Sequence, residues 1–197
     1  MAVITLPFVE PLVVEPPAVI SIEGKVRSKP HRLNLNLTSN EKSNATRPLH
    51  ISIRFDKQVI VFNSIRDGKW DVEETLKTFP FRRDSEFELS VLVTKNIYEL
   101  SVDGKFVYAY KQRQPHNFSS VKFINLQDTT NDDSAPGFIV KSVKFEAYRE
   151  KQKQWSYPLQ RSISDTSEHD LSLPTLSSAG AGAYTSSGSV FHTSPST

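Results

Sequence analysis

Apolar and polar residues alternate along most of the first 148 residues, which is the pattern of half-buried β-strands. Between Leu49 and Phe55, for example, every second residue is leucine, isoleucine or phenylalanine. No segment keeps a helical period for three turns. The same alternation predicts strands within the segments Leu33–Leu37, Leu49–Phe55, Val59–Asn63, Phe87–Val93, Tyr98–Val102, Phe106–Tyr110, Val121–Asn125 and Phe138–Phe145.

Tight turns connect some of these strands. Asp103-Gly104 lies directly between two alternating runs, and Asp67-Gly68 marks a second turn of the same kind. A type I′ turn needs positive φ at both central residues, which Asp-Gly tolerates well. Short strands at close spacing with frequent turns predict an all-β fold, an antiparallel sandwich or barrel.

The composition changes near residue 149. From Arg161 to Thr197, Ser and Thr account for 16 of 37 residues, and the large apolar residues follow no period. Such a segment buries too little apolar area to offset the loss of chain entropy. We therefore expect a globular domain over residues 4–148, a C-terminal extension over 149–160 and a disordered Ser/Thr-rich tail over 161–197.

Composition and charge exclude several classes of protein. The chain has no Cys, which removes disulfide frameworks, thiolate metal sites and cysteine nucleophiles. A net charge of +2 over 197 residues gives no general case for nucleic-acid binding. No apolar run is long enough to cross a membrane, and the first residues do not read as a secretory leader. We expect a cytoplasmic protein.

One strand predicts a polar face. Because the apolar residues of 49–55 share one side, His50, Ser52 and Arg54 share the other. Asn63, Trp70 and Glu73 follow in the chain, and together these six residues suit a neutral ligand rich in hydroxyls. Taken singly, each favours a plainer interpretation, because outward charges usually form a solvated face and a lone Trp usually lies in the core.

The order of these residues resembles the galectin carbohydrate-recognition domain. The matching segments are His50-Ile-Ser-Ile-Arg-Phe55, Val61-Phe-Asn-Ser64, Trp70-Asp-Val-Glu73 and Phe79-Pro-Phe81. Ile20 to Val26 and Arg32 to Leu37 also resemble the early strands of that family. The similarity covers roughly residues 4 to 147.

The resemblance implies a two-sheet jelly-roll sandwich that binds β-galactosides on its concave sheet without catalysis, metal or cofactor. By position, His50 and Arg54 would bond the axial 4-hydroxyl of galactose. Asn63 and Glu73 would hold the 6-hydroxyl, Glu73 would also orient Arg54, and Trp70 would stack on the sugar ring. The implied partners are galactoside-containing glycans, with homodimerisation an open option and export without a signal peptide suggested.

Several departures from the family pattern fall inside the site. Ser52 and Ile53 replace the Asn and Pro between His50 and Arg54. Asp71 stands where the family has Gly after the Trp, and Thr75 replaces the Arg that closes the motif. The loop after Arg54 is also short. We therefore expect a retained galactose site with weakened or altered contacts to the second sugar.

Two other function classes remain to be weighed. The departures at Ser52, Asp71 and Thr75 also fit a galectin-fold interaction module that has lost sugar binding. An enzyme is the weakest option, because the adjacent Glu73 and Glu74 point to opposite faces of a strand and cannot flank one bond. Short basic clusters such as Lys111 to Arg113 are interpreted as solvated surface rather than a nucleic-acid stripe.

Overall fold

Alternating strands build the whole of the described chain. The computed structural model describes residues 3–13, 15–41, 46–113, 121–129 and 136–149, and no helix occurs among them. The predicted disordered tail lies outside these residues. The strands are β1 (Phe8–Pro11), β2 (Ala18–Val26), β3 (Arg32–Thr38), β4 (Arg47–Arg54), β5 (Val59–Arg66), β6 (Lys69–Trp70), β7 (Glu74–Leu76), β8 (Glu86–Val93), β9 (Ile97–Val102), β10 (Lys105–Lys111), β11 (Phe123–Thr129) and β12 (Phe138–Ala147).

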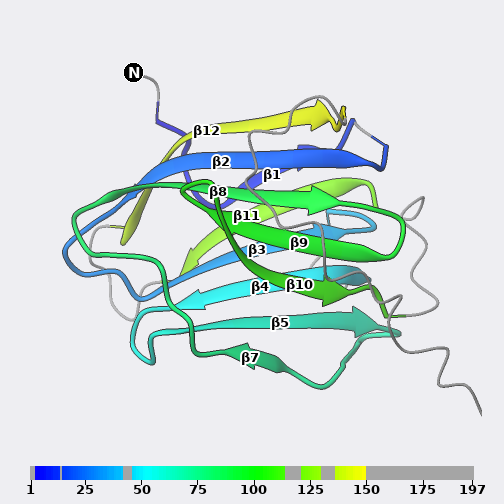
Figure 1. Ribbon diagram of the computed structural model, residues 1–197, viewed down its shortest axis with the longest axis horizontal. Helices are drawn as coiled ribbons and strands as arrows, with labels where there is room; N and C mark the ends of the chain where they lie inside the picture. Colours follow the sequence, from blue (N-terminus) through cyan, green and yellow to red (C-terminus); the bar gives the residue numbers. More distant parts are fainter. Residues whose placement is uncertain (1–2, 14, 42–45, 114–120, 130–135, 150–197) are drawn as a thin grey trace, which may run out of the picture. The chain divides into compact units, whose positions relative to one another are not determined.

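The strands form two antiparallel sheets. One sheet has the order β1-β11-β3-β4-β5-β6, with β7 also paired to β5, and the other has the order β10-β9-β8-β2-β12. In Figure 1, β7 lies beside β5 at one edge of the sandwich and β12 lies at the opposite edge. The predicted all-β sandwich is confirmed.

The core lies between the two sheets and consists of the apolar half of each alternation. It includes Leu49, Ile51 and Ile53 of β4, each at most 1 % exposed, together with Phe62 of β5. The same alternation sends the neighbouring residues of β4 to the outer surface of the seven-stranded sheet. Strand β4 therefore contributes apolar side chains to the core and polar side chains to the outer face of the seven-stranded sheet.

Both predicted Asp-Gly turns are present. Asp67 and Gly68 have φ of 51° and 73°, and Asp103 and Gly104 have φ of 50° and 69°. Positive φ at both central residues is the type I′ geometry that joins two adjacent strands. The first of these turns carries the chain from β5 into β6 and so determines where Trp70 lies.

The sequence pattern is misleading at one strand. The run over residues 121–125 predicts a strand with Phe123 on its apolar face, yet Ile124 and Leu126 are the fully buried residues of β11. They pair with Leu37 and Leu35 of β3, which already face the core, and paired residues share a face. Neighbouring strands therefore decide the orientation of β11.

Candidate functional site

A row of polar residues crosses the outer face of the seven-stranded sheet. His50 of β4 pairs with Asn36 of β3 on one side and with Asn63 of β5 on the other. Ser52 and Arg54 follow His50 at intervals of two on β4, so the structure brings all three onto the same face as predicted. Glu73 and Trp70 reach this row from the segment that follows β5.

Hydrogen bonding and burial determine the tautomer and the charge of His50. Its Nδ1 lies 2.6 Å from Oδ1 of Asn36, so Nδ1–H donates and Nε2 is left as an acceptor. Burial, followed by the nearby charges of Arg47 and Arg54, lowers the pKa of His50 from 6.5 to about 4. At neutral pH the site therefore offers an uncharged imidazole that accepts a hydrogen bond.

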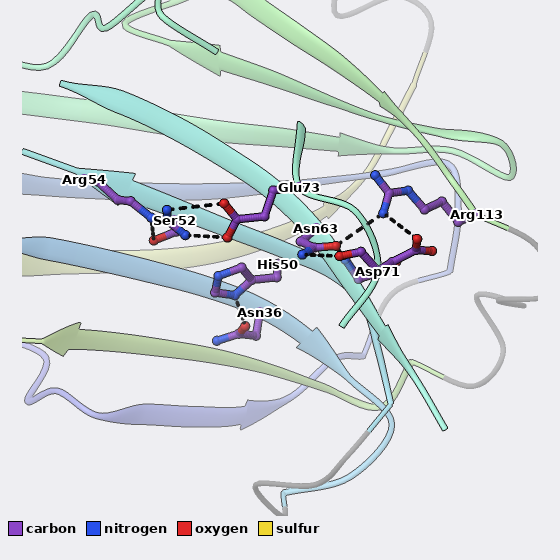
Figure 2. A network of polar contacts seen from close by, with 9 residues as sticks. Asn36, His50, Ser52, Arg54, Asn63, Asp71, Glu73 and Arg113 are labelled. Atoms are coloured by element: carbon purple, nitrogen blue, oxygen red, sulfur yellow. Dashed lines mark hydrogen bonds and ion pairs between the residues drawn. The ribbon is translucent and has the colours of Figure 1, made fainter. Parts of the chain in front are cut away.

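Arg54 and Glu73 form a two-pronged ion pair beside His50. Nη2 of Arg54 donates to Glu73 Oε1 at 2.8 Å, and Nη1 donates to Oε2 at 3.4 Å. Nε of Arg54 donates to Ser52 Oγ at 3.4 Å, as Figure 2 shows. The hydrogen bond from Arg54 holds the pKa of the Glu73 carboxyl below its usual range. The guanidinium plane is thus fixed along this face.

Ser52 contributes less to this face than its neighbours. It is fully buried, under the Arg54 side chain that donates to it. A serine hydroxyl lies close to the backbone, and here it supports the guanidinium. Ser52 therefore steadies Arg54 in this arrangement, whereas Arg54 itself remains partly exposed at 16 %.

Trp70 lies on the surface, against His50. Trp70 is 52 % exposed, so the interpretation that this Trp lies in the core is wrong. The ring centroids of Trp70 and His50 are 4.8 Å apart at an interplanar angle of 67°, and the Arg47 guanidinium lies 5.7 Å from the indole centroid. Rings at that separation are in van der Waals contact, so no sugar ring fits between them here.

Asn63 is tied down by three contacts. Its Nδ2 donates to the backbone oxygen of Asp71 at 2.9 Å, and its Oδ1 accepts from the backbone N–H of Ser64 at 2.8 Å and from Nη1 of Arg113 at 3.2 Å. Figure 2 shows Asn63 and Asp71 between the β4 residues and Arg113. The predicted residue Asn63 is thus present on this face but only 2 % exposed.

Arg113 is the residue that sequence reasoning missed. It was predicted to be solvated surface, which is wrong, because its side chain is 20 % exposed and pairs with Glu74 at 2.9 Å and Asp71 at 3.4 Å. Its guanidinium also lies 5.2 Å from the Tyr110 ring centroid. No local pattern marks Arg113, because it follows β10 in the other sheet and meets β7 only in the folded chain.

The two adjacent glutamates point in different directions, as predicted. Glu73 pairs with Arg54 on the outer face, whereas Glu74 accepts from Tyr108 at 2.8 Å and pairs with Arg113. The two carboxylates therefore serve separate partners. Thr75, which follows them, is exposed and offers only a short hydroxyl at this edge of the face.

The described residues contain no cluster of three or more His, Asp or Glu side chains that could hold a metal ion. They also include no helix with the length and apolarity needed to cross a membrane. The polar face presents hydrogen-bonding groups, the Glu73 carboxylate and the Trp70 indole.

The chain is similar in sequence to known proteins. A family model described as galactoside-binding lectin matches residues 7–131. Rat galectin-4 is 32 % identical over 97 residues, which cover 49 % of this chain, and rat galectin-7 is 30 % identical over 105 residues, which cover 53 % of it. The chain spans only 30 % of the length of galectin-4 but 77 % of galectin-7.

Solved structures show the same fold. The structure of sheep galectin-11 in complex with glycerol superposes with a TM-score of 0.63 at 20 % identity, covering 72 % of this chain and 98 % of the sheep protein. The matching family consists of galactoside-binding lectins, which are non-enzymatic proteins. With a family model that matches most of the domain and a relative covered over three quarters of its length, this chain belongs to the galactoside-binding lectin family, the galectins.

Proposed function

We propose that the face around His50, Arg54 and Glu73 binds the galactose of β-galactoside glycans. One observation carries the proposal: strand β4 presents two complementary groups side by side. They are a neutral His50 imidazole that can accept a hydrogen bond and an Arg54 guanidinium that Glu73 holds in place. A hydroxyl is both donor and acceptor. One sugar hydroxyl can donate to Nε2 of His50 and accept from Arg54, and family resemblance assigns this place to the axial 4-hydroxyl.

Asn63 and Glu73 complete the galactose site. In this proposal both lie at the 6-hydroxyl, as the family resemblance implies, with Asn63 donating through Nδ2 and Glu73 accepting through its carboxylate. The ion pair with Arg54 keeps Glu73 ionised and oriented for that role. A galactose bound in this way has directed partners for its axial and its exocyclic hydroxyl groups.

We infer that Trp70 moves when a ligand binds. The ring centroids of Trp70 and His50 are 4.8 Å apart, and carbon atoms in contact lie about 3.5–4.0 Å apart, so no sugar ring fits between the two rings in this arrangement. Trp70 is half exposed and lies in a two-residue strand next to a turn, which leaves the outward direction open. We expect the indole to swing outward and stack on the apolar face of the sugar.

The second sugar of a disaccharide has fewer partners. Thr75 replaces the family Arg at the edge of the face, and a hydrogen bond to a charged group contributes about 1.5–3 kcal/mol. Such a loss corresponds to about one to two decades in affinity. We therefore propose a lectin that binds galactose itself and discriminates little at the neighbouring sugar.

Retention on immobilised lactose tests the proposal. The wild-type protein is expected to bind and to elute with free lactose, whereas Trp70→Ala is expected to flow through. Val72→Ala is the matched control, because Val72 is 76 % exposed beside the site and no ligand contact is assigned to it. A wild-type protein that is not retained contradicts the proposal.

The second candidate function is a protein-interaction module on the same fold. The contact of Trp70 with His50 favours it, because in this arrangement the indole packs against a residue of the candidate site. A glycan array separates the two candidates. Binding to galactoside-terminated glycans that is lost in Trp70→Ala supports the lectin, and the absence of any hit supports the interaction module.

A further inference from the structure

The side-chain amide of Asn63 has its hydrogen-bonding capacity almost filled. An amide offers two N–H donors and two acceptor lone pairs. The oxygen accepts from Ser64 and Arg113, and one N–H donates to the backbone of Asp71. Among the described residues, the second N–H of Nδ2 has no partner, so it is the one hydrogen-bond donor that Asn63 can still offer to a ligand.

Arg113 is itself held on several sides. Its Nη2 donates to Glu74 Oε1 at 2.9 Å, and Glu74 is fixed in turn by the Tyr108 hydroxyl at 2.8 Å. The guanidinium lies against the Tyr110 ring, with its carbon 5.2 Å from the centroid. A planar guanidinium presents several donors in a rigid fork. Arg113 can therefore serve Glu74 and Asn63 at the same time.

Arg113 contacts Asn63 and also Asp71, one of the other two partners of Asn63. Nη1 of Arg113 donates to Oδ1 of Asn63. The backbone oxygen of Asp71 accepts from Asn63, and the Asp71 carboxylate lies 3.4 Å from Nη1 of Arg113. The Ser64 N–H and the Asp71 carbonyl already determine which end of the amide carries the N–H groups, and the charged donor Arg113 reinforces this orientation and strengthens the N–H groups as donors.

We propose that Arg113 is a positioning residue that presents the free Nδ2–H of Asn63 to the ligand, and that it thereby makes the site selective for galactosides with a free hydroxyl at C6. The inference rests on the proposed function, in which Asn63 faces that hydroxyl. Arg113 does not touch the sugar in this scheme. Its effect on binding is transmitted through Asn63 and Asp71.

The test compares lactose with 6′-deoxylactose, which lacks only the C6 hydroxyl of the galactose, by calorimetric titration. Arg113→Ala is expected to weaken lactose binding about fivefold, the effect of one hydrogen bond, and to change 6′-deoxylactose binding less than about twofold. Arg113→Lys keeps a cation between Asp71 and Glu74 but lacks the planar fork, so the same selective loss is expected. It also provides the test if Arg113→Ala does not fold. Lys111→Ala, the matched loss of one positive charge from β10, should leave both affinities unchanged.

Equal loss for both sugars would mean that Arg113 acts only on the structure of the domain, which overturns the inference. Wild-type protein that binds both sugars equally also overturns it, because Asn63 then does not recognise C6. A protein that binds neither sugar refutes the proposed function as well. Independently of any sugar, NMR of the Asn63 side-chain amide should show an ordered NH2 group in the wild type and a less ordered one in Arg113→Ala, which keeps only the contacts with Ser64 and Asp71, and unchanged order in that variant contradicts the inference.

Discussion

At the scale of single residues, the chemistry of the polar face depends on the charge of the His50 imidazole and on which of its nitrogens carries a proton. The imidazole is neutral because it is buried near two arginines, and Asn36 fixes the proton on Nδ1. Nε2 is then an acceptor, a role that a charged imidazole loses. A hydroxyl-bearing ligand therefore meets one acceptor at His50 and one cationic donor at Arg54.

Sugar binding should be insensitive to pH near neutrality and fail in acid. With the His50 pKa at about 4, lactose affinity is expected to stay constant from pH 8 to about 5 and to fall as the pH passes 4. Calorimetric titration across this range, together with an NMR titration of the His50 ring, measures both events. An affinity that already falls near pH 6.5 would show that His50 titrates at its ordinary pKa.

The same shift has a consequence for stability. The unfolded chain takes up a proton at this histidine near pH 6.5, whereas the folded chain does so only near pH 4. The contribution of His50 to the free energy of unfolding is therefore complete above pH 6.5 and declines as the pH falls to 4. Urea unfolding of the wild type and of His50→Gln should show a steeper acid loss in the wild type, and equal slopes would contradict this assignment.

Movement of Trp70 should be visible by fluorescence. The chain has a second tryptophan, Trp155, so the measurement uses a Trp155→Phe background. Lactose is expected to change the emission of Trp70, because the indole exchanges its contact with His50 for a contact with the sugar. Lactose binding with unchanged emission would contradict the outward movement.

At the scale of strands and turns, a polar contact joins the edges of the two sheets. Glu74 of β7 accepts from Tyr108 of β10, and the two strands belong to different sheets. The same carboxylate pairs with Arg113, which reaches Asn63. The contact of Glu74 with Tyr108, which links the two sheets, thus also supports the candidate site through Arg113.

Loss of this contact should destabilise the domain. Tyr108→Phe is expected to lower the free energy of unfolding by about 1 kcal/mol, the net value of one hydrogen bond. Tyr98→Phe is the matched control, because the buried hydroxyl of Tyr98 has no hydrogen-bond partner among the described residues, so its removal should be neutral or stabilising. Urea unfolding measures both, and equal effects would contradict the assigned contact.

The long strands could be predicted from sequence and the short ones could not. Alternation marks β3, β4 and β8 because each faces the core on one side, and Asp-Gly marks the turns. The strands β1, β6 and β7 have two to four residues each, too few for a period, and they exist because a neighbouring strand pairs with them. The grouping of His50, Ser52 and Arg54 follows from β4 alone, whereas the positions of Arg113 and Asp71 require the folded chain.

At the scale of the whole molecule, the described core ends early. The last residue of the buried apolar cluster is Val140 of β12, well before the Ser/Thr-rich segment. We therefore expect a chain that ends at Pro158 to melt at the same temperature and to bind lactose with the same affinity as the full chain. A chain that ends at Pro136 lacks β12 and should not fold, and altered lactose affinity in the longer truncation would give the tail a role in binding.

The central claim is that this face binds galactosides through His50, Arg54 and Glu73 with Trp70 as the stacking surface. Calorimetric titration of lactose into the wild type and Trp70→Ala tests it most directly, with Val72→Ala as the control and circular dichroism to confirm folding. The account predicts binding by the wild type and by Val72→Ala and at least a tenfold loss, or about 1.4 kcal/mol, in Trp70→Ala. No binding by folded wild-type protein, or equal affinity in Trp70→Ala, would contradict it.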